Sequence, residues 1–307
     1  MTVAGEIIVS VAIVKNNDSY RGVLSALNLI ANEIDKTLDN RKNILVKPNF
    51  VSIFNPLSTT PRETVEAIID FIYNRYNVSE IVIAESPAIG SFNQAIEFLG
   101  YKELAKRYTS IEFLDLDDYE QEIITLEDEY HNLFEVSVSK ILMDNRFFKI
   151  SACRAKTHDT VIVTLSIKNV VMGSIKRGYK SRMHRGYFSI NYNIAKLATR
   201  LMPDLGIVDG VVAMEGDGPV NGEKKCWGVV FASTNPVNLD VATTYAMGFN
   251  PSDVGYLFFL SRWGYGEVDI KRIKILGENI DTIRSPFKPH RSYKEQLIWK
   301  AYKDLKF

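Results

Sequence analysis

Two histidines and a group of basic residues lie close together near the middle of the chain. Lys156 and His158 precede an apolar segment, Lys168 and Asn169 lie inside it, and His184 belongs to the basic loop that follows. Lysine ammoniums bind carboxylates and phosphates, whereas a histidine can transfer a proton near neutral pH. A lysine in an apolar segment is costly to bury unless it reaches water or meets an anion. We therefore predict an anion site in which His158, His184 and Lys168 carry out acid–base chemistry.

Polar residues also end two strands that are predicted upstream of this segment. The strand at 43–46 stops at Lys47-Pro48-Asn49, because proline cannot donate to a sheet, and the strand at 80–84 stops at Glu85. Ligands of α/β proteins collect at the carboxyl ends of strands. The predicted ligand-binding residues are therefore Lys47, Asn49, Glu85, Lys156, Asn169 and, from the basic loop, Arg182.

A glycine-rich turn at residues 215–222 has acidic residues around it. It lacks the G-x-G-x-x-G spacing of a dinucleotide-binding loop, and its simplest explanation is a tight turn that needs positive φ. Carboxylates on loops are also ligands of hard cations such as Mg²⁺. The candidate ligands of a divalent metal are Asp209, Glu215, Asp217 and Asp240. Orienting the lysines is the alternative role of the three aspartates.

The composition narrows the classes of function. Lys+Arg and Asp+Glu both number 37, so the formal net charge is zero and a nucleic-acid partner is disfavoured. Cys153 and Cys226 lie far apart, which excludes an iron–sulfur cluster bound by cysteines of this chain alone. No uncharged apolar segment reaches the roughly 18 residues of a membrane span, and the first residues do not resemble a signal peptide. We therefore expect a cytoplasmic protein without membrane contact, and the oligomeric state does not follow from the sequence.

The order of predicted elements indicates the fold class. Strands and helices alternate through the first third of the chain, which predicts a mixed, largely parallel sheet flanked by helices. Residues 123–138 are predicted to form a hairpin, as a small β insertion. Residues 160–171 fit either a strand or a helix, because their apolar residues alternate while Gly173 is well placed to end a helix. We expect a single domain over residues 1–307, built as one unit or as two closely packed lobes, 1–115 and 116–307.

Several short motifs, in order along the chain, resemble the domain of unknown function 362 family. The resemblance covers about residues 47–277 and implies no settled activity. Many members of that family carry an added ferredoxin-type domain and look redox-associated, whereas this chain has no cysteine quartet. The Lys and His motifs are also distantly similar to the nickel-pincer lactate racemase family, which implies a small carboxylate or phosphorylated ligand. The motifs are Lys47-Pro48-Asn49, Thr60-Pro61, Glu85-Ser86-Pro87, Lys156-Thr157-His158, residues 164–169 with Gly173, Asp209-Gly210, residues 214–219 with Gly222, and residues 236–240 with Gly248.

Three functions are compatible with these features. The one we expect is acid–base catalysis on a small anionic ligand in a cleft lined by lysines and histidines. The second is a binding or scaffold module that docks an acidic partner without catalysis, which strong salt dependence without turnover would indicate. The third is a redox-associated partner of a separate iron–sulfur protein, which co-purification with a coloured cluster would indicate.

Overall fold

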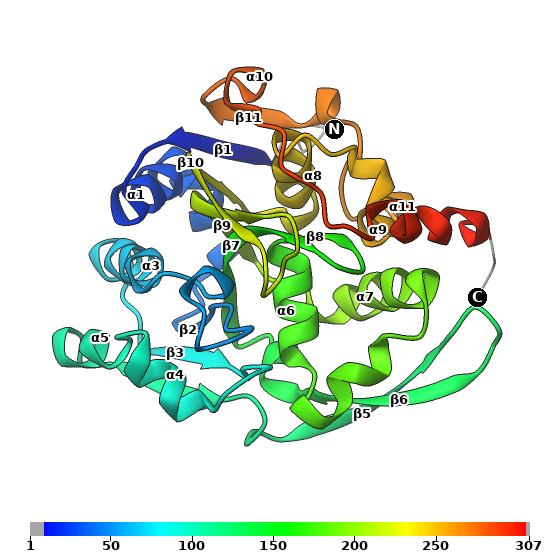
Figure 1. Cartoon of the computed structure of the whole chain (residues 1–307). Coiled ribbons are helices and arrows are strands. Elements are labelled where there is room, and N and C mark those ends of the chain that lie inside the picture. Colours follow the sequence, from blue (N-terminus) through cyan, green and yellow to red (C-terminus); the bar gives the residue numbers. More distant parts are fainter. Residues whose placement is uncertain (1–8, 305–307) are drawn as a thin grey trace, which may run out of the picture.

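One continuous sheet organises the molecule. The computed structural model describes residues 9–304, and within them nine strands form a mixed, mostly parallel sheet (Figure 1). The predicted α/β fold is thus confirmed. Strands from both sides of residue 115 belong to this sheet. In spatial order the strands are β11 (Lys274–Gly277), β1 (Ser10–Lys15), β10 (Glu223–Ser233), β9 (Leu205–Glu215), β7 (Phe147–His158), β2 (Asn43–Lys47), β3 (Glu80–Glu85) and β4 (Ile111–Asp115), with β8 (Ile162–Thr164) paired to β7.

The direction of the central strands decides where the polar residues gather. β2 pairs in parallel with both β3 and β7, and β7 pairs in parallel with β9. Their carboxyl ends therefore meet at the same edge of the sheet. Lys47 ends β2, Glu85 ends β3 and His158 ends β7. The sequence predicts a strand over 147–153, but β7 continues past Cys153 to His158 and pairs antiparallel with β8.

Helices cover both faces of the sheet. One apolar cluster joins the first five helices to alternate strand residues such as Ile44 and Ile83, and a second joins the later helices to the intervening residues such as Leu45 and Val82. This alternation shows that the two clusters lie on opposite faces. The first set comprises α1 (Ser19–Leu29), α2 (Ala31–Leu38), α3 (Arg62–Arg75), α4 (Phe92–Phe98) and α5 (Lys102–Arg107), and the second comprises α6 (Ser166–Ser174), α7 (Tyr187–Leu201), α8 (Pro236–Ala246) and α9 (Gly255–Arg262).

The ambiguous segment at 160–171 contains both kinds of structure. Its first residues form β8, and α6 begins directly afterwards at Ser166. Gly173 lies inside α6 and does not end it. The residue before the helix, Leu165, cannot cap it, so the buried carboxylate of Asp240 accepts the first backbone N–H groups instead, at 2.9 Å from Ser166 N and 3.0 Å from Ile167 N.

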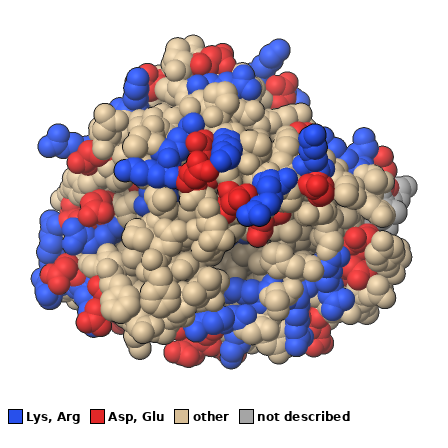
Figure 2. Space-filling model, viewed as in Figure 1, with Lys and Arg blue, Asp and Glu red and all other residues tan. Residues whose placement is uncertain are grey.

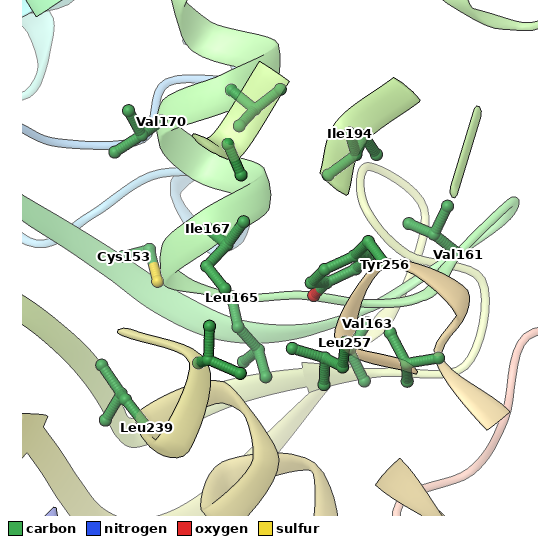
Figure 3. Packing of buried hydrophobic residues seen from close by; sticks show 14 of the residues in the cluster. Cys153, Val161, Val163, Leu165, Ile167, Val170, Ile194, Leu239, Tyr256 and Leu257 are labelled. Atoms are coloured by element: carbon green, nitrogen blue, oxygen red, sulfur yellow. The ribbon is translucent and has the colours of Figure 1, made fainter. Parts of the chain in front are cut away.

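The two sides of α6 have different compositions. Ile167, Val170 and Val171 follow the spacing of one helix face and belong to the hydrophobic core. Figure 3 shows Ile167 in this core together with Ile194 of α7 and Tyr256 of α9. The opposite side carries Lys168, Asn169, Met172 and Gly173, and these residues line a cleft. The helix therefore fixes its polar side toward the carboxyl ends of the strands.

The predicted hairpin is confirmed as an antiparallel pair that is separate from the main sheet, β5 (Gln121–Glu127) and β6 (Leu133–Ser139). Other boundaries differ from the sequence-based prediction. The apolar spacing over 21–38 predicts one helix, but the structure divides it at Ile30. Thr60-Pro61 predicts a helix capped by Thr60, but Pro61 occupies the cap position of α3. Residues 6–14 are predicted to form a strand, of which residues 6–8 lie outside the described part of the chain.

The remaining elements are short. β11 is followed by α10 (Ile280–Ile283). The sequence predicts a single terminal helix over 292–306, whose last two residues lie outside the described range, but the structure has two short elements there, α11 (Tyr293–Gln296) and η6 (Leu297–Tyr302). None of the helices described in residues 9–304 is long and apolar enough to span a lipid bilayer.

Candidate functional site

A buried ion pair joins the ends of β2 and β3. The Nζ atom of Lys47 lies 2.7 Å from Glu85 Oε1, and both side chains are almost fully buried. The same ammonium donates to Pro48 O at 2.9 Å and to Asn169 Oδ1 at 3.1 Å. Burial lowers the pKa of Lys47, and the charge of Glu85 opposes that shift. All three donors of the ammonium therefore have protein partners.

Asn169 connects this ion pair to a second buried lysine. Its Oδ1 accepts from Asn49 Nδ2 at 3.1 Å, and Asn49 Oδ1 in turn accepts from Lys156 Nζ. The Lys156 ammonium also donates to Ser58 O at 2.8 Å. Burial lowers the pKa of Lys156 to about 7. Among residues 9–304 the ammonium of Lys156 has hydrogen bonds but no ion pair with a carboxylate that would oppose this shift. The polar atoms of Asn49 and Asn169 are thus used to hold lysines.

A cleft of about 210 Å³ opens beside this network. Figure 2 shows a hollow near the centre of the face, with Lys and Arg atoms along its lower margin. Six of the predicted site residues line the cleft, and they come from the ends of β2, β3 and β7, from α6 and from the basic loop. They are Asn49, Glu85, His158, Lys168, Asn169 and His184. Lys47 and Lys156 lie one layer behind the lining.

Lys168 differs from Lys47 and Lys156 in that its ammonium has no partner among residues 9–304. It is 7% exposed and lines the cleft, and within residues 9–304 its ammonium makes no hydrogen bond or ion pair. Burial lowers the pKa of Lys168 to about 8, which the charge of Asp159 opposes and that of Lys180 reinforces. The side chain is therefore a buried cation whose donors are directed to the cleft rather than to the protein.

The geometry around His158 fixes its tautomer. The backbone N–H of Thr160 donates to His158 Nδ1 at 3.0 Å, so that nitrogen must carry a lone pair. Asp159 Oδ1 also lies 3.0 Å from Nδ1, but an ion pair there would need a protonated ring. Burial lowers the pKa of His158 to about 3, with the charge of Lys168 as the next cause, so the neutral ring prevails. Its proton is then on Nε2, as a donor.

The basic loop contributes unequally to the cleft. It forms the short helix η3 (Arg177–Met183), and Lys180 lines the cleft while donating to Ser86 O at 2.5 Å. Burial lowers the pKa of Lys180 to about 8. His184 stands at the exposed rim. Arg182 does not line the cleft: it packs over the ring of Tyr179 and donates to Glu135 O at 3.3 Å.

The four acids considered as metal ligands lie apart, each with its own partner. Asp209 accepts from Thr64 Oγ1 at 2.6 Å, Glu215 pairs with Lys225, and Asp217 pairs with Arg291. Asp240 caps α6, and burial raises its pKa to about 8. Within residues 9–304 no three His, Cys, Asp or Glu side chains are grouped so that they could hold a metal ion.

Part of the cleft was not predicted from the sequence. Lys180 was not among the predicted site residues, yet it lines the cleft. Thr164 also lines the cleft, and its buried hydroxyl has no hydrogen-bond partner among residues 9–304. The side chains of Phe50 and Met172 form an apolar part of the wall of the cleft. The spacing of four between Thr164, Lys168 and Met172 is the signal in the sequence that relates these three positions.

The chain is similar to a described protein family and to two individual proteins. A family model described as Domain of unknown function (DUF362) matches residues 44–245. A thylakoid-associated protein from Synechocystis is 26% identical over 229 residues, which is 72% of this chain and 68% of that protein. A crystal structure of a Thermotoga maritima protein is similar with a TM-score of 0.40 and 12% identity, and the match covers 73% of this chain and 57% of that one.

Proposed function

The chain belongs to the DUF362 family, whose description assigns no activity, and from the geometry of its cleft we propose that it binds a small anionic metabolite and acts on it by acid–base chemistry. The ligand is a carboxylate or a phosphorylated compound. The observation that carries this proposal is the side chain of Lys168, which is 7% exposed at the cleft and whose ammonium has no partner among residues 9–304. A buried cation of this kind is costly unless an anion offsets it.

The balance of charge around the cleft supports the same ligand class. Among the described residues that line the cleft or lie directly behind it, lysines outnumber carboxylates. Glu85 is already paired with Lys47, and Asp159 stands near Lys168. A bound carboxylate or phosphate would supply the missing negative charge, and it would accept hydrogen bonds from Lys168 Nζ and His158 Nε2. The lysines are Lys47, Lys156, Lys168 and Lys180, and the carboxylates are Glu85 and Asp159.

The volume of the cleft limits the ligand to a small molecule. At about 30 Å³ per water, a space of about 210 Å³ corresponds to roughly seven waters. Typical sites for drug-sized ligands begin at about 300 Å³. A metabolite of a few carbon atoms that bears a carboxylate or phosphate matches this size.

The roles that we propose differ among the three predicted catalytic residues. Lys168 is the group that exchanges a proton with the ligand, because a pKa near 8 leaves both of its forms populated near neutral pH. His158 is a neutral hydrogen-bond donor and not a base, since its Nδ1 lone pair is occupied by the Thr160 N–H. His184, at the rim, is placed to exchange protons with water.

The binding part of the proposal is tested by calorimetry with succinate and with inorganic phosphate. We expect Lys168→Met to weaken the binding of at least one of them by about tenfold or more, because a hydrogen bond to a charged group contributes about 1.5–3 kcal/mol. Lys176→Met is the matched control, since Lys176 is exposed beside η3 and does not line the cleft. Equal affinities of the two variants and the wild type would show that the anion does not bind in the cleft.

The catalytic part is tested by exchange of carbon-bound hydrogen with solvent. We expect the protein in D2O to accelerate deuterium incorporation at C3 of 2-oxobutyrate, and Lys168→Met to abolish the acceleration, because removal of that proton requires a positioned base. Anion binding without any exchange would favour the alternative of a binding module. The cytoplasmic location expected from the sequence stays a prediction.

A further inference from the structure

Of the four lysines around the cleft, only Lys168 has an amine nitrogen without a partner among residues 9–304. Lys47 pairs with Glu85, and the Nζ atom of Lys156 donates to Asn49 and to Ser58 O. Lys180 donates to Ser86 O. A hydrogen bond or ion pair of this kind holds the proton on the nitrogen. Lys168 is therefore the lysine whose nitrogen is easiest to bring to a ligand atom.

The surroundings of Lys168 also disfavour its charged form. The residue is buried beside a cleft whose walls include the apolar side chains of Phe50 and Met172. Lys180 lines the same cleft and repels a second positive charge there. Burial in an apolar wall and a neighbouring cation are the two conditions that convert a lysine into a nucleophile.

From this geometry we propose that Lys168 forms an imine with the carbonyl group of its ligand, which makes the ligand a small anionic aldehyde or oxo acid. This inference rests on the proposed function, because the cationic cleft supplies the affinity for the anionic group. Lys180 has donors beyond the one used by Ser86 and can hold the carboxylate or phosphate, while Lys168 reacts with the carbonyl.

The chemical step is balanced without an oxidant or a reductant. The neutral Nζ of Lys168 attacks the carbonyl carbon, a C–N bond forms and the electron pair of the C=O π bond moves to oxygen. That oxygen takes up a proton as the nitrogen gives one up, which yields a carbinolamine. Loss of the oxygen as water, with its C–O electron pair, and loss of the second amine proton leave the C=N bond. The imine then draws electrons from the adjacent carbon and makes its hydrogens acidic, so that Lys168 promotes proton exchange through the imine and is not itself the base that removes the proton.

The test is reductive trapping of the wild-type protein with glyoxylate and sodium cyanoborohydride near neutral pH, followed by peptide mass mapping. We expect the mass of one carboxymethyl group on Lys168, formed about tenfold faster than on the exposed Lys176, because the amine of Lys168 is desolvated and free. An excess of succinate should slow the modification of Lys168 and leave that of Lys176 unchanged. Lys168→Arg, which keeps the charge, should lose the selective adduct.

The outcomes separate this inference from the proposed function. Adducts spread evenly over exposed lysines, or selective modification of Lys180, would overturn the imine even if succinate still bound in the cleft. Absence of both a selective adduct and succinate or phosphate binding would overturn the imine and the anion site together. Because the trapping is read on the wild-type protein, a folding defect in Lys168→Arg cannot decide the result.

Discussion

Gly173 leaves the space that the end of the Lys47 side chain occupies. A Cβ atom at position 173 would lie 2.0 Å from Lys47 Cε and 2.3 Å from Lys47 Nζ. The glycine is in the last turn of α6, and Lys47 ends β2. The absence of a side chain at 173 thus allows the ammonium to reach Glu85, Asn169 and Pro48 O in one buried position.

This contact predicts that Gly173→Ala destabilises the protein. In an exposed helix the same substitution would stabilise by about 1 kcal/mol, because alanine is the better helix former. Here the added methyl group must displace Lys47, and overpacking of this kind costs about 1–3 kcal/mol. Chemical denaturation measures the free energy of unfolding. Gly178→Ala is the control, since a Cβ at that position meets no atom within 4 Å. A stabilised Gly173→Ala variant would contradict the contact.

The buried ion pair predicts a large effect of removing one partner. Lys47→Met leaves the carboxylate of Glu85 buried without its counter-charge, which costs about 3–5 kcal/mol. The exposed pair between Lys106 and Glu103 has the same 2.7 Å separation, and Lys106→Met should change the free energy of unfolding little, because water and salt screen that pair. Similar losses in the two variants would show that burial does not set the contribution of the Lys47 pair.

The cleft lysines predict that anion binding weakens as pH rises through about 8. Lys168 and Lys180 must be protonated to hold the charge of succinate, and burial lowers the pKa of each to about 8. Above that pH the protein must take up a proton for each lysine, at a loss of about tenfold in affinity per pH unit and proton. Calorimetry from pH 6 to 9.5 would show this dependence. Lys168→Met should have a shallower slope, and an unchanged slope would exclude Lys168 from the coupling.

The tautomer of His158 is a prediction for nitrogen NMR. With Nδ1 accepting from the Thr160 N–H and the pKa lowered to about 3, the ring should stay neutral with its proton on Nε2 from pH 5 to 8. Long-range ¹H–¹⁵N spectra distinguish the two nitrogens. Thr160→Pro removes the donor, and it should allow the proton to move to Nδ1 beside Asp159. A titration of His158 between pH 6 and 7 in the wild type would contradict this assignment.

The sequence itself determined the class of fold and named many of the residues that line the cleft. Alternating apolar strands and helices predict a largely parallel sheet, and the stop at Lys47-Pro48-Asn49 marks the end of β2, because these patterns depend on local physics. The capping box of Ser91 and Gln94 is local too, and it is present at the start of α4. A lysine inside an apolar segment was enough to indicate a buried cation at Lys168.

Only the tertiary structure decided which partners each of those residues contacts. Whether a buried lysine is paired depends on residues far away in sequence: Glu85 lies 38 positions from Lys47, and Asn49 lies 107 positions from Lys156. The same long-range packing placed Asp240 at the start of α6 and turned Arg182 away from the cleft, and it left the nitrogen of Lys168 without a partner in the described part of the chain. Local patterns fix which side chains are polar and buried, whereas the crossing of distant strands and helices fixes which of them meet.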